Sequence, residues 1–293
     1  MHFLILCILS STGIFVIFKV IDRIGLPAFP VIVINYLAAT LLGFLIHAGP
    51  VSVADLRTVD WLPASVLIGV LFIVMFFIIG YSTRKAGISV TTVASKMSVI
   101  FPIVFSLAID PSDRLSTVKL AGILCALAGV GLTVLKPSAS RFDIKVIYVP
   151  LILFIGMGFV DSLVKYAQHH FVRDPDTALF GAVVFLNAFL SGLIMTILFP
   201  HYHRWFLKPS VWGLGILLGG VNFGSIYFMV RALNYRSPVG TGIDSSVVFG
   251  VNNIGIVGLS VLAGLWIFRE KLLPLNWIGI TLSIAAILLL TLD

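Results

Sequence analysis

The sequence predicts an all-α membrane protein in which ten transmembrane helices form an inverted 5+5 repeat. Three observations lead to this fold class. Hydrophobic residues fill 59% of the 293 positions and charged residues only 11%, whereas soluble proteins carry roughly 25% charged residues. Apolar runs of about 20 residues, the length that crosses a bilayer, recur between short polar breaks. The two halves of the chain also show polar residues in the same order.

The apolar runs place the helices. Helical spans are expected because backbone groups in lipid must form hydrogen bonds within their own segment. The first run lacks the basic residues and the cleavage site of a signal peptide, so we interpret it as a retained helix. We predict the ten helices at Phe3–Val20, Phe29–Ile46, Leu62–Tyr81, Ile88–Ala108, Val118–Leu135, Ile147–Ala167, Thr177–Phe199, Val211–Val230, Pro238–Phe268 and Leu273–Leu290.

The repeat divides the chain into residues 1–137 and 138–293. The fourth run aligns with the ninth, and Lys96 then falls opposite Asp244. The second and seventh runs each hold one asparagine at similar depth, Asn35 and Asn187. Because each copy contains five spans, an odd number, the two copies must cross the membrane in opposite directions, as in many secondary transporters.

Two charges at membrane depth are the strongest site candidates. A charge near the bilayer centre costs about 2.5–3.5 kcal/mol on insertion scales, so it usually faces a cavity or a partner. Lys96, flanked by Ser95 and Ser98, is a candidate to bind an anionic or carboxylate-bearing solute. The alternatives are a structural ion pair and a side chain that extends to the membrane interface. Asp244 is a candidate proton-binding group, or the partner of Lys96 in a gate or a static pair.

Further polar residues in the runs are weaker candidates. Asp161 and Lys165 are four residues apart, share a helix face, and are expected to form a local ion pair or part of a gate. Pro102 removes one helical hydrogen bond and is expected to kink the fourth helix. The remaining candidates can contact a solute or serve helix packing, and they are Asn35, Asn187, Asn222, Asn252 and Tyr81.

A family resemblance follows from this layout. Ten short-looped spans, an acidic residue before the fifth and tenth helices, and the segment Glu270-Lys271-Leu272…Trp277-Ile278-Gly279 resemble the EamA-type ten-helix branch of the drug/metabolite transporter (DMT) superfamily. The resemblance covers essentially the whole chain. It implies a cavity lined by the first, third, fourth, sixth, eighth and ninth helices, and substrates that range from amino acids to drugs.

These observations favour a secondary transporter over an enzyme. The chain contains no nucleotide, catalytic or metal-ligand motif, so we expect no cofactor and a carrier driven by a gradient. We predict an exporter or exchanger that moves a small-molecule solute across the cell (inner) membrane by alternating access. We further expect a monomer in the lipid bilayer that binds no nucleic acid. Coupling of transport to protons is one possible driving mechanism. The alternatives to a carrier are a channel or facilitator and an intramembrane lipid-processing enzyme. The Lys and Arg residues of the loops favour the opposite orientation to that implied by the resemblance.

Overall fold

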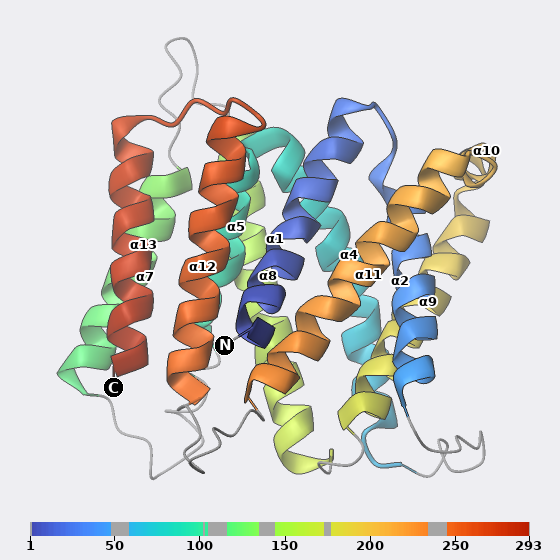
Figure 1. Ribbon diagram of the computed structural model, residues 1–293, viewed down its shortest axis with the longest axis horizontal. Coiled ribbons are helices and arrows are strands. Elements are labelled where there is room, and N and C mark those ends of the chain that lie inside the picture. Colours follow the sequence, from blue (N-terminus) through green and yellow to red (C-terminus); the bar gives the residue numbers. More distant parts are fainter. Residues whose placement is uncertain are drawn as a thin grey trace.

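The computed structural model describes residues 2–47, 59–101, 103–104, 116–134, 144–172, 177–233 and 245–292. Within these ranges the chain is all-helical (Figure 1). The long helices are α1 (His2–Arg23), α2 (Ala28–Ile46), α4 (Leu62–Ala86), α5 (Ile88–Met97), α7 (Thr117–Val134), α8 (Ile144–His170), α9 (Thr177–Leu198), α11 (Pro209–Leu233), α12 (Ser245–Trp266) and α13 (Pro274–Leu292). The short helices η2 (Pro200–Tyr202) and α10 (His203–Phe206) connect α9 to α11.

The length and composition of these helices identify a multi-pass membrane protein. Among the described residues, five helices are long and apolar enough to cross a membrane: α1, α2, α4, the part of α9 from Leu179 to Leu198, and the part of α11 from Pro209 to Ala232. Apolar side chains also cover much of the outer surface, for example Leu45, which is 80% exposed, and Trp266, which is 77% exposed. Exposed apolar surface on this scale suits a lipid environment rather than water.

The helix that carries Lys96 is interrupted, as the proline predicts. Helix α5 ends at Met97, Ser98 and Val99 form a turn, and helical residues resume at Ile100. A proline at position 102 has no N–H to offer the carbonyl four residues earlier, which is that of Ser98. This carbonyl instead accepts a hydrogen bond of 2.9 Å from the N–H of Phe101. In the ninth run, the described helix begins at Ser245, and residues 238–244 lie outside the described ranges.

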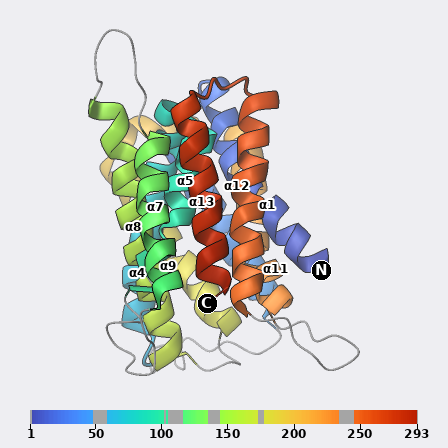
Figure 2. The same ribbon diagram turned by 90° about the vertical axis from the view of Figure 1, so that its left-hand side faces the viewer.

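The helices run up and down through one bundle. Helix α1 begins and α13 ends at the same end of the bundle, the lower end in Figure 1. Helices α7 and α13 lie side by side at the left edge of Figure 1 and in the foreground of Figure 2, and they pack closely against each other. Helices α2, α9 and α11 lie toward the opposite edge, and α1, α5 and α12 lie between these groups.

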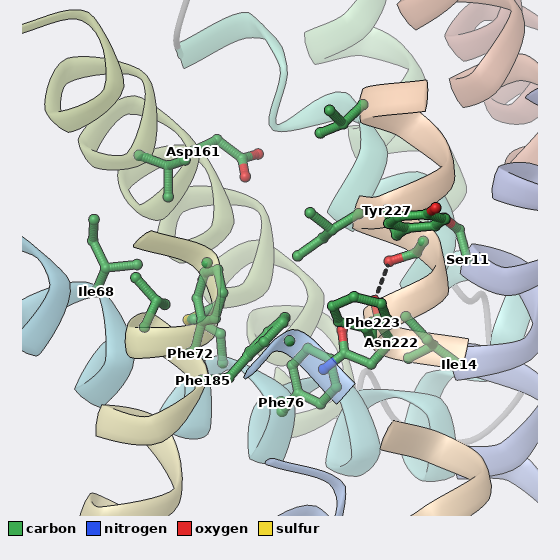
Figure 3. Close-up of a pocket in the computed structure, with 18 of the residues that line it drawn as sticks. Ser11, Ile14, Ile68, Phe72, Phe76, Asp161, Phe185, Asn222, Phe223 and Tyr227 are labelled. Atoms are coloured by element: carbon green, nitrogen blue, oxygen red, sulfur yellow. Dashed lines mark hydrogen bonds between the residues drawn. The ribbon is translucent and has the colours of Figure 1, made fainter. Parts of the chain in front are cut away.

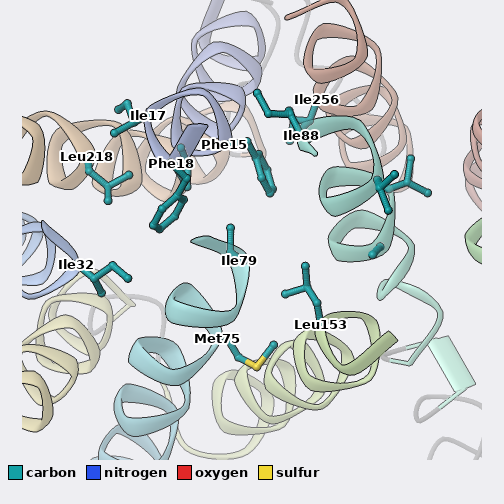
Figure 4. Packing of buried hydrophobic residues seen from close by; sticks show 14 of the residues in the cluster. Phe15, Ile17, Phe18, Ile32, Met75, Ile79, Ile88, Leu153, Leu218 and Ile256 are labelled. Carbon is teal, nitrogen blue, oxygen red and sulfur yellow. The ribbon is translucent and has the colours of Figure 1, made fainter. Parts of the chain in front are cut away.

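The buried core joins all of these groups. Figure 4 shows Phe15 and Phe18 of α1 converging with Met75 and Ile79 of α4 and with Leu153 of α8. All five side chains are less than 5% exposed. Burying a side chain of this size contributes roughly 1.5–3 kcal/mol where the surroundings would otherwise be water. In lipid, where burial displaces no water, close packing between helices supplies the stabilisation instead.

Glycines permit the close helix contacts. A Cβ atom added at Gly215 of α11 would lie 2.5 Å from Cβ of Ile34, and one at Gly219 would lie 2.6 Å from the Asn35 carbonyl oxygen, both on α2. The Gly215-x-x-x-Gly219 pattern therefore serves a contact inside the chain. The neighbouring Gly220-x-x-x-Gly224 pattern does not act as a unit, since a Cβ at Gly220 would meet no described residue within 4 Å.

Candidate functional site

A cavity of about 580 Å³ lies between helices from both halves of the chain. Its lining includes Gly43 and Ile46 near the end of α2, Phe180 and Gly181 near the start of α9, and Arg231 near the end of α11. These residues mark one end of the bundle, the end at which α1 begins. The cavity extends to this end, where Ile46 is 44% exposed. Its volume falls in the range of about 300–1,000 Å³ that is typical of small-molecule sites.

Two opposite charges line the deep part of the cavity. Lys96 comes from the last turn of α5 and Asp161 from the middle of α8, and these helices pack against each other. The two charges are near enough to interact electrostatically. They do not form a direct ion pair, because the ion pairs between described side chains are Lys19–Glu270 and Arg84–Asp22.

The interrupted helix positions Asp161. The Ser98 hydroxyl lies 3.0 Å from the carboxylate oxygen Oδ2 of Asp161 and 2.6 Å from the backbone carbonyl of Ser95. Figure 3 shows Asp161 projecting from α8 into the cavity, with Ser11 and Tyr227 across from it. The turn that follows α5 therefore holds one oxygen of this carboxylate through Ser98, while the carboxylate itself lines the cavity.

Aromatic side chains form much of the remaining wall. Phe72 and Phe76 of α4 lie beside Phe185 of α9, with the rings of Phe72 and Phe185 centred 6.2 Å apart (Figure 3). On the other side, the rings of Phe223 and Tyr227 of α11 stack with centroids 5.8 Å apart. Both α4 and α11 thus present two aromatic rings at a four-residue spacing, which places them on one helix face.

A polar cluster ties the helices together at the opposite end of the bundle. Glu270, in the connection between α12 and α13, accepts hydrogen bonds from the backbone N–H of Ile88 at 2.8 Å and from the Ser89 hydroxyl at 3.2 Å. Its carboxylate therefore caps the start of α5, where the helix dipole favours a negative charge. Lys19 of α1 lies 3.7 Å from the same carboxylate. Within this cluster Gly87 has a φ of 97°, a conformation that favours glycine.

The structure separates the asparagine candidates. Asn222 lines the cavity, and its side-chain N–H donates at 3.2 Å to the side-chain oxygen of buried Asn35. Asn187 donates to the Ser65 hydroxyl at 3.1 Å and serves the contact between α9 and α4. Asn252 is buried away from the cavity, and its side-chain oxygen has no hydrogen-bond partner among the described residues.

The other candidates fall in different places. Ser95 lines the cavity with Lys96, while Tyr81 is 40% exposed on α4 and does not. Asp244 lies outside the described residues, as does the side chain of Lys165, so the Lys96–Asp244 and Asp161–Lys165 pairs stay predictions. In the described part of the chain, no three His, Cys, Asp or Glu residues gather as a metal site would require.

The aromatic wall and the Glu270 cap are not evident from the sequence. The four-residue spacings Phe72–Phe76 and Phe223–Tyr227 are visible in the sequence. In a chain with 23 phenylalanines, however, such spacings are frequent and do not indicate a cavity. Glu270 stands out in the sequence only as the acidic residue before the tenth helix, because its contact with Ile88 spans 182 residues.

Two known proteins are similar to this chain over nearly its full length. No protein-family model matches. An uncharacterized protein of Haemophilus influenzae is 28% identical over 296 residues, which cover 98% of this chain and 96% of the relative. A protein of known crystal structure shares 17% identity with a TM-score of 0.59, over 99% of this chain and 96% of that chain. At this identity the likeness concerns the fold alone, and the chain shares that fold along nearly its whole length.

Proposed function

We propose that the protein is a secondary transporter of the EamA type in the drug/metabolite transporter superfamily, and that it moves a small solute by alternating access. The observation that carries the proposal is a cavity that contains Lys96 and Asp161 and extends toward one end of the bundle. At the other end, the Lys19–Glu270 ion pair and the cap on α5 tie the helices together. A carrier in one of its two end states is expected to combine a cavity at one end of the bundle with helices held together at the other end.

The packing of the helices supports ten spans in an inverted 5+5 repeat. In the repeat, α8 corresponds to α1, α11 to α4 and α12 to α5. Helix α1 packs on α11 and α12, and α8 correspondingly packs on α4 and α5. Helix α2 packs on α11, as α9 packs on α4. The remaining counterparts, α7 with α13, α5 with α12 and α2 with α9, pack on each other. An in-plane two-fold axis produces this pattern of exchanged partners.

Reconstituted transport tests the proposal. The purified protein in proteoliposomes is expected to give saturable flux of at least one solute from a metabolite panel, measured with and without a pH gradient. Lys96→Met and Asp161→Asn are each expected to reduce this flux at least tenfold, because each removes a charge from the cavity. Ser162→Ala is the matched control, since this neighbouring hydroxyl bonds to the Gly158 carbonyl of its own helix and does not line the cavity.

The same measurement separates the alternatives. Flux that rises linearly with solute concentration would favour a channel. Unchanged flux in both charge variants would contradict the assignment of the cavity as the transport site.

A further inference from the structure

The connection between α9 and α11 lies where the hydrocarbon core of the membrane ends. The apolar part of α9, Leu179–Leu198, has 20 residues. At the helical rise this part is about 30 Å long, which matches the thickness of the hydrocarbon core. Residues 199–208 then form η2, α10 and the turn before α11, at the upper end of the bundle in Figure 1. The connection is therefore at the level of the lipid headgroups.

Aromatic side chains anchor one side of this connection to the bundle. Tyr202, Trp205 and Phe206 are partly buried against the hydrophobic core. The Tyr202 ring lies 4.9 Å from the ring of Phe29 at the start of α2, measured between centroids. The indole N–H of Trp212 on α11 donates to the Phe206 carbonyl at 2.7 Å. These contacts fix the position of α10 on the bundle.

Two exposed cations share one ring of this connection. The guanidinium carbon of Arg204 and the ammonium nitrogen of Lys208 lie 5.6 and 4.2 Å from the centroid of the Trp205 ring. Neither cation has an ion-pair partner among the described residues. The sequence also contains no Asp or Glu between residues 177 and 243. The two charges therefore lie near each other and are available to an anion outside the chain.

An apolar side chain stands beside these cations. Leu207 is 84% exposed, the largest exposed fraction of any large hydrophobic side chain in the described ranges. An interfacial helix can bury such a side chain at the boundary between headgroups and acyl chains. A free anion or an acidic protein would satisfy the cations but would not account for the exposed leucine. A phospholipid supplies both a phosphate and acyl chains.

We propose that the surface formed by Arg204, Leu207 and Lys208 binds an anionic phospholipid. The two cations hold its phosphate, and Leu207 contacts its acyl chains. An anionic lipid is favoured because the headgroup of a zwitterionic lipid carries its own cation, which offsets the charge of the phosphate. The inference is independent of the proposed transport function, since no residue of this surface lines the cavity.

Native mass spectrometry of the purified full-length protein tests the proposal. The delipidated protein is titrated with phosphatidylglycerol, which is anionic, or with phosphatidylcholine, which has the same phosphate but no net charge. Each basic residue near anionic headgroups contributes about fivefold in affinity, which corresponds to about 1 kcal/mol. Phosphatidylglycerol is therefore expected to bind at least tenfold more tightly. Equal binding of the two lipids would overturn the proposal.

Paired substitutions locate the site. Arg204→Gln with Lys208→Gln is expected to remove most of the preference for phosphatidylglycerol. The matched control is Arg269→Gln with Lys271→Gln, which removes the same charge from two exposed residues at the same end of the bundle and is expected to keep the preference. An equal loss in both pairs would show only a general attraction of this end for anionic lipid and would overturn the site.

Two further variants separate charge from folding and from apolar contact. Arg204→Lys with Lys208→Arg keeps both charges and is expected to keep the preference, so its loss in this variant would contradict the role of charge. Leu207→Ser is expected to weaken the binding of both lipids alike and to leave the preference unchanged. Unchanged binding of both lipids in Leu207→Ser would contradict the acyl-chain contact.

Soluble glycerol phosphate distinguishes a lipid from a free anion. It carries a phosphate without acyl chains, and it is expected not to displace phosphatidylglycerol even in large excess. Displacement would show that the surface binds a free phosphate compound, and it would overturn the lipid assignment.

Discussion

At the scale of single residues, Ser98 connects the broken helix to the charged cavity. Its hydroxyl has one proton and two acceptors within reach, the Ser95 carbonyl at 2.6 Å and Asp161 Oδ2 at 3.0 Å. A hydroxyl donates fully to only one acceptor at a time, although it can accept as well. The Ser98 hydroxyl can therefore donate its hydrogen bond to Asp161 when that group is a carboxylate. When Asp161 is a carboxylic acid, the same hydroxyl can accept a hydrogen bond from it and donate its own to the Ser95 carbonyl.

Gly87 and Glu270 are expected to depend on each other. A Cβ atom at Gly87 would lie 2.7 Å from Oε1 of Glu270, and φ is 97° there. Gly87→Ala therefore adds a steric clash of about 1–3 kcal/mol to a backbone strain of about 1–2 kcal/mol. Gly25→Ala is the matched control, because Gly25 has a φ of 70° but a Cβ there meets nothing within 4 Å.

A double-mutant cycle measures this dependence. The free energy of unfolding, obtained by SDS titration, is expected to fall more for Gly87→Ala than for Gly25→Ala. In a Glu270→Ala background the clash is gone, so the two glycine substitutions are expected to cost similar amounts. If the extra cost of Gly87→Ala persists in that background, Glu270 is not its cause.

At the scale of elements, the pair α7 and α13 shows how helices associate at the edge of the bundle. The Thr133 hydroxyl donates to the Gly129 carbonyl on α7, and the Ser283 hydroxyl donates to the Gly279 carbonyl on α13, at 2.7 and 2.9 Å. Each glycine faces the hydroxyl-bearing residue of the other helix. A glycine opposite a small hydroxyl residue lets the two backbones approach closely, which is a common basis of helix association in lipid.

This crossing is expected to tolerate no added methyl group. A Cβ at Gly129 would lie 2.9 Å from the backbone nitrogen of Ser283, so Gly129→Ala is expected to cost about 1–3 kcal/mol through overpacking. Gly131→Ala on the same helix meets nothing within 4 Å and is expected to be neutral or slightly stabilising. Thermal unfolding of both variants in the same detergent is the check, and equal midpoints would contradict the close crossing.

At the scale of the whole molecule, the cavity extends toward one end of the bundle and polar contacts tie the helices at the other. The contacts that close the other side come from elements far apart in sequence: Lys19 on α1, the start of α5, and Glu270 between α12 and α13. In the proposed transport cycle, opening that side would require these contacts to break while the helix ends around Gly43 and Arg231 come together. In alternating access the two halves exchange these roles.

Thiol labelling from each side of the membrane is expected to follow this asymmetry. Ser225 of α11 lines the cavity, so Ser225→Cys in a background without Cys7 and Cys125 is expected to react with an impermeant reagent from the open side only. Adding Lys19→Met and Glu270→Gln weakens the closed end and is expected to increase labelling from the other side several-fold. Lys208→Cys, on the exposed turn before α11, is the control that reports the closed side in both backgrounds.

Labelling from both sides before these changes would contradict a closed end. No increase after them would show that the Lys19–Glu270 pair does not hold that end shut.

The sequence by itself determined the membrane class, the apolar runs and the break after α5, and it singled out Lys96, which lines the cavity. These features depend on composition and on neighbours within a few residues, such as Pro102 and the Ser98 carbonyl, which a sequence displays directly. Only the tertiary structure decided that Asp161 faces the cavity with Lys96, that Asn187 pairs with Ser65, and that Glu270 caps α5. These contacts depend on how helices far apart in sequence cross, and crossings are set by the summed packing of small and large side chains rather than by any local pattern.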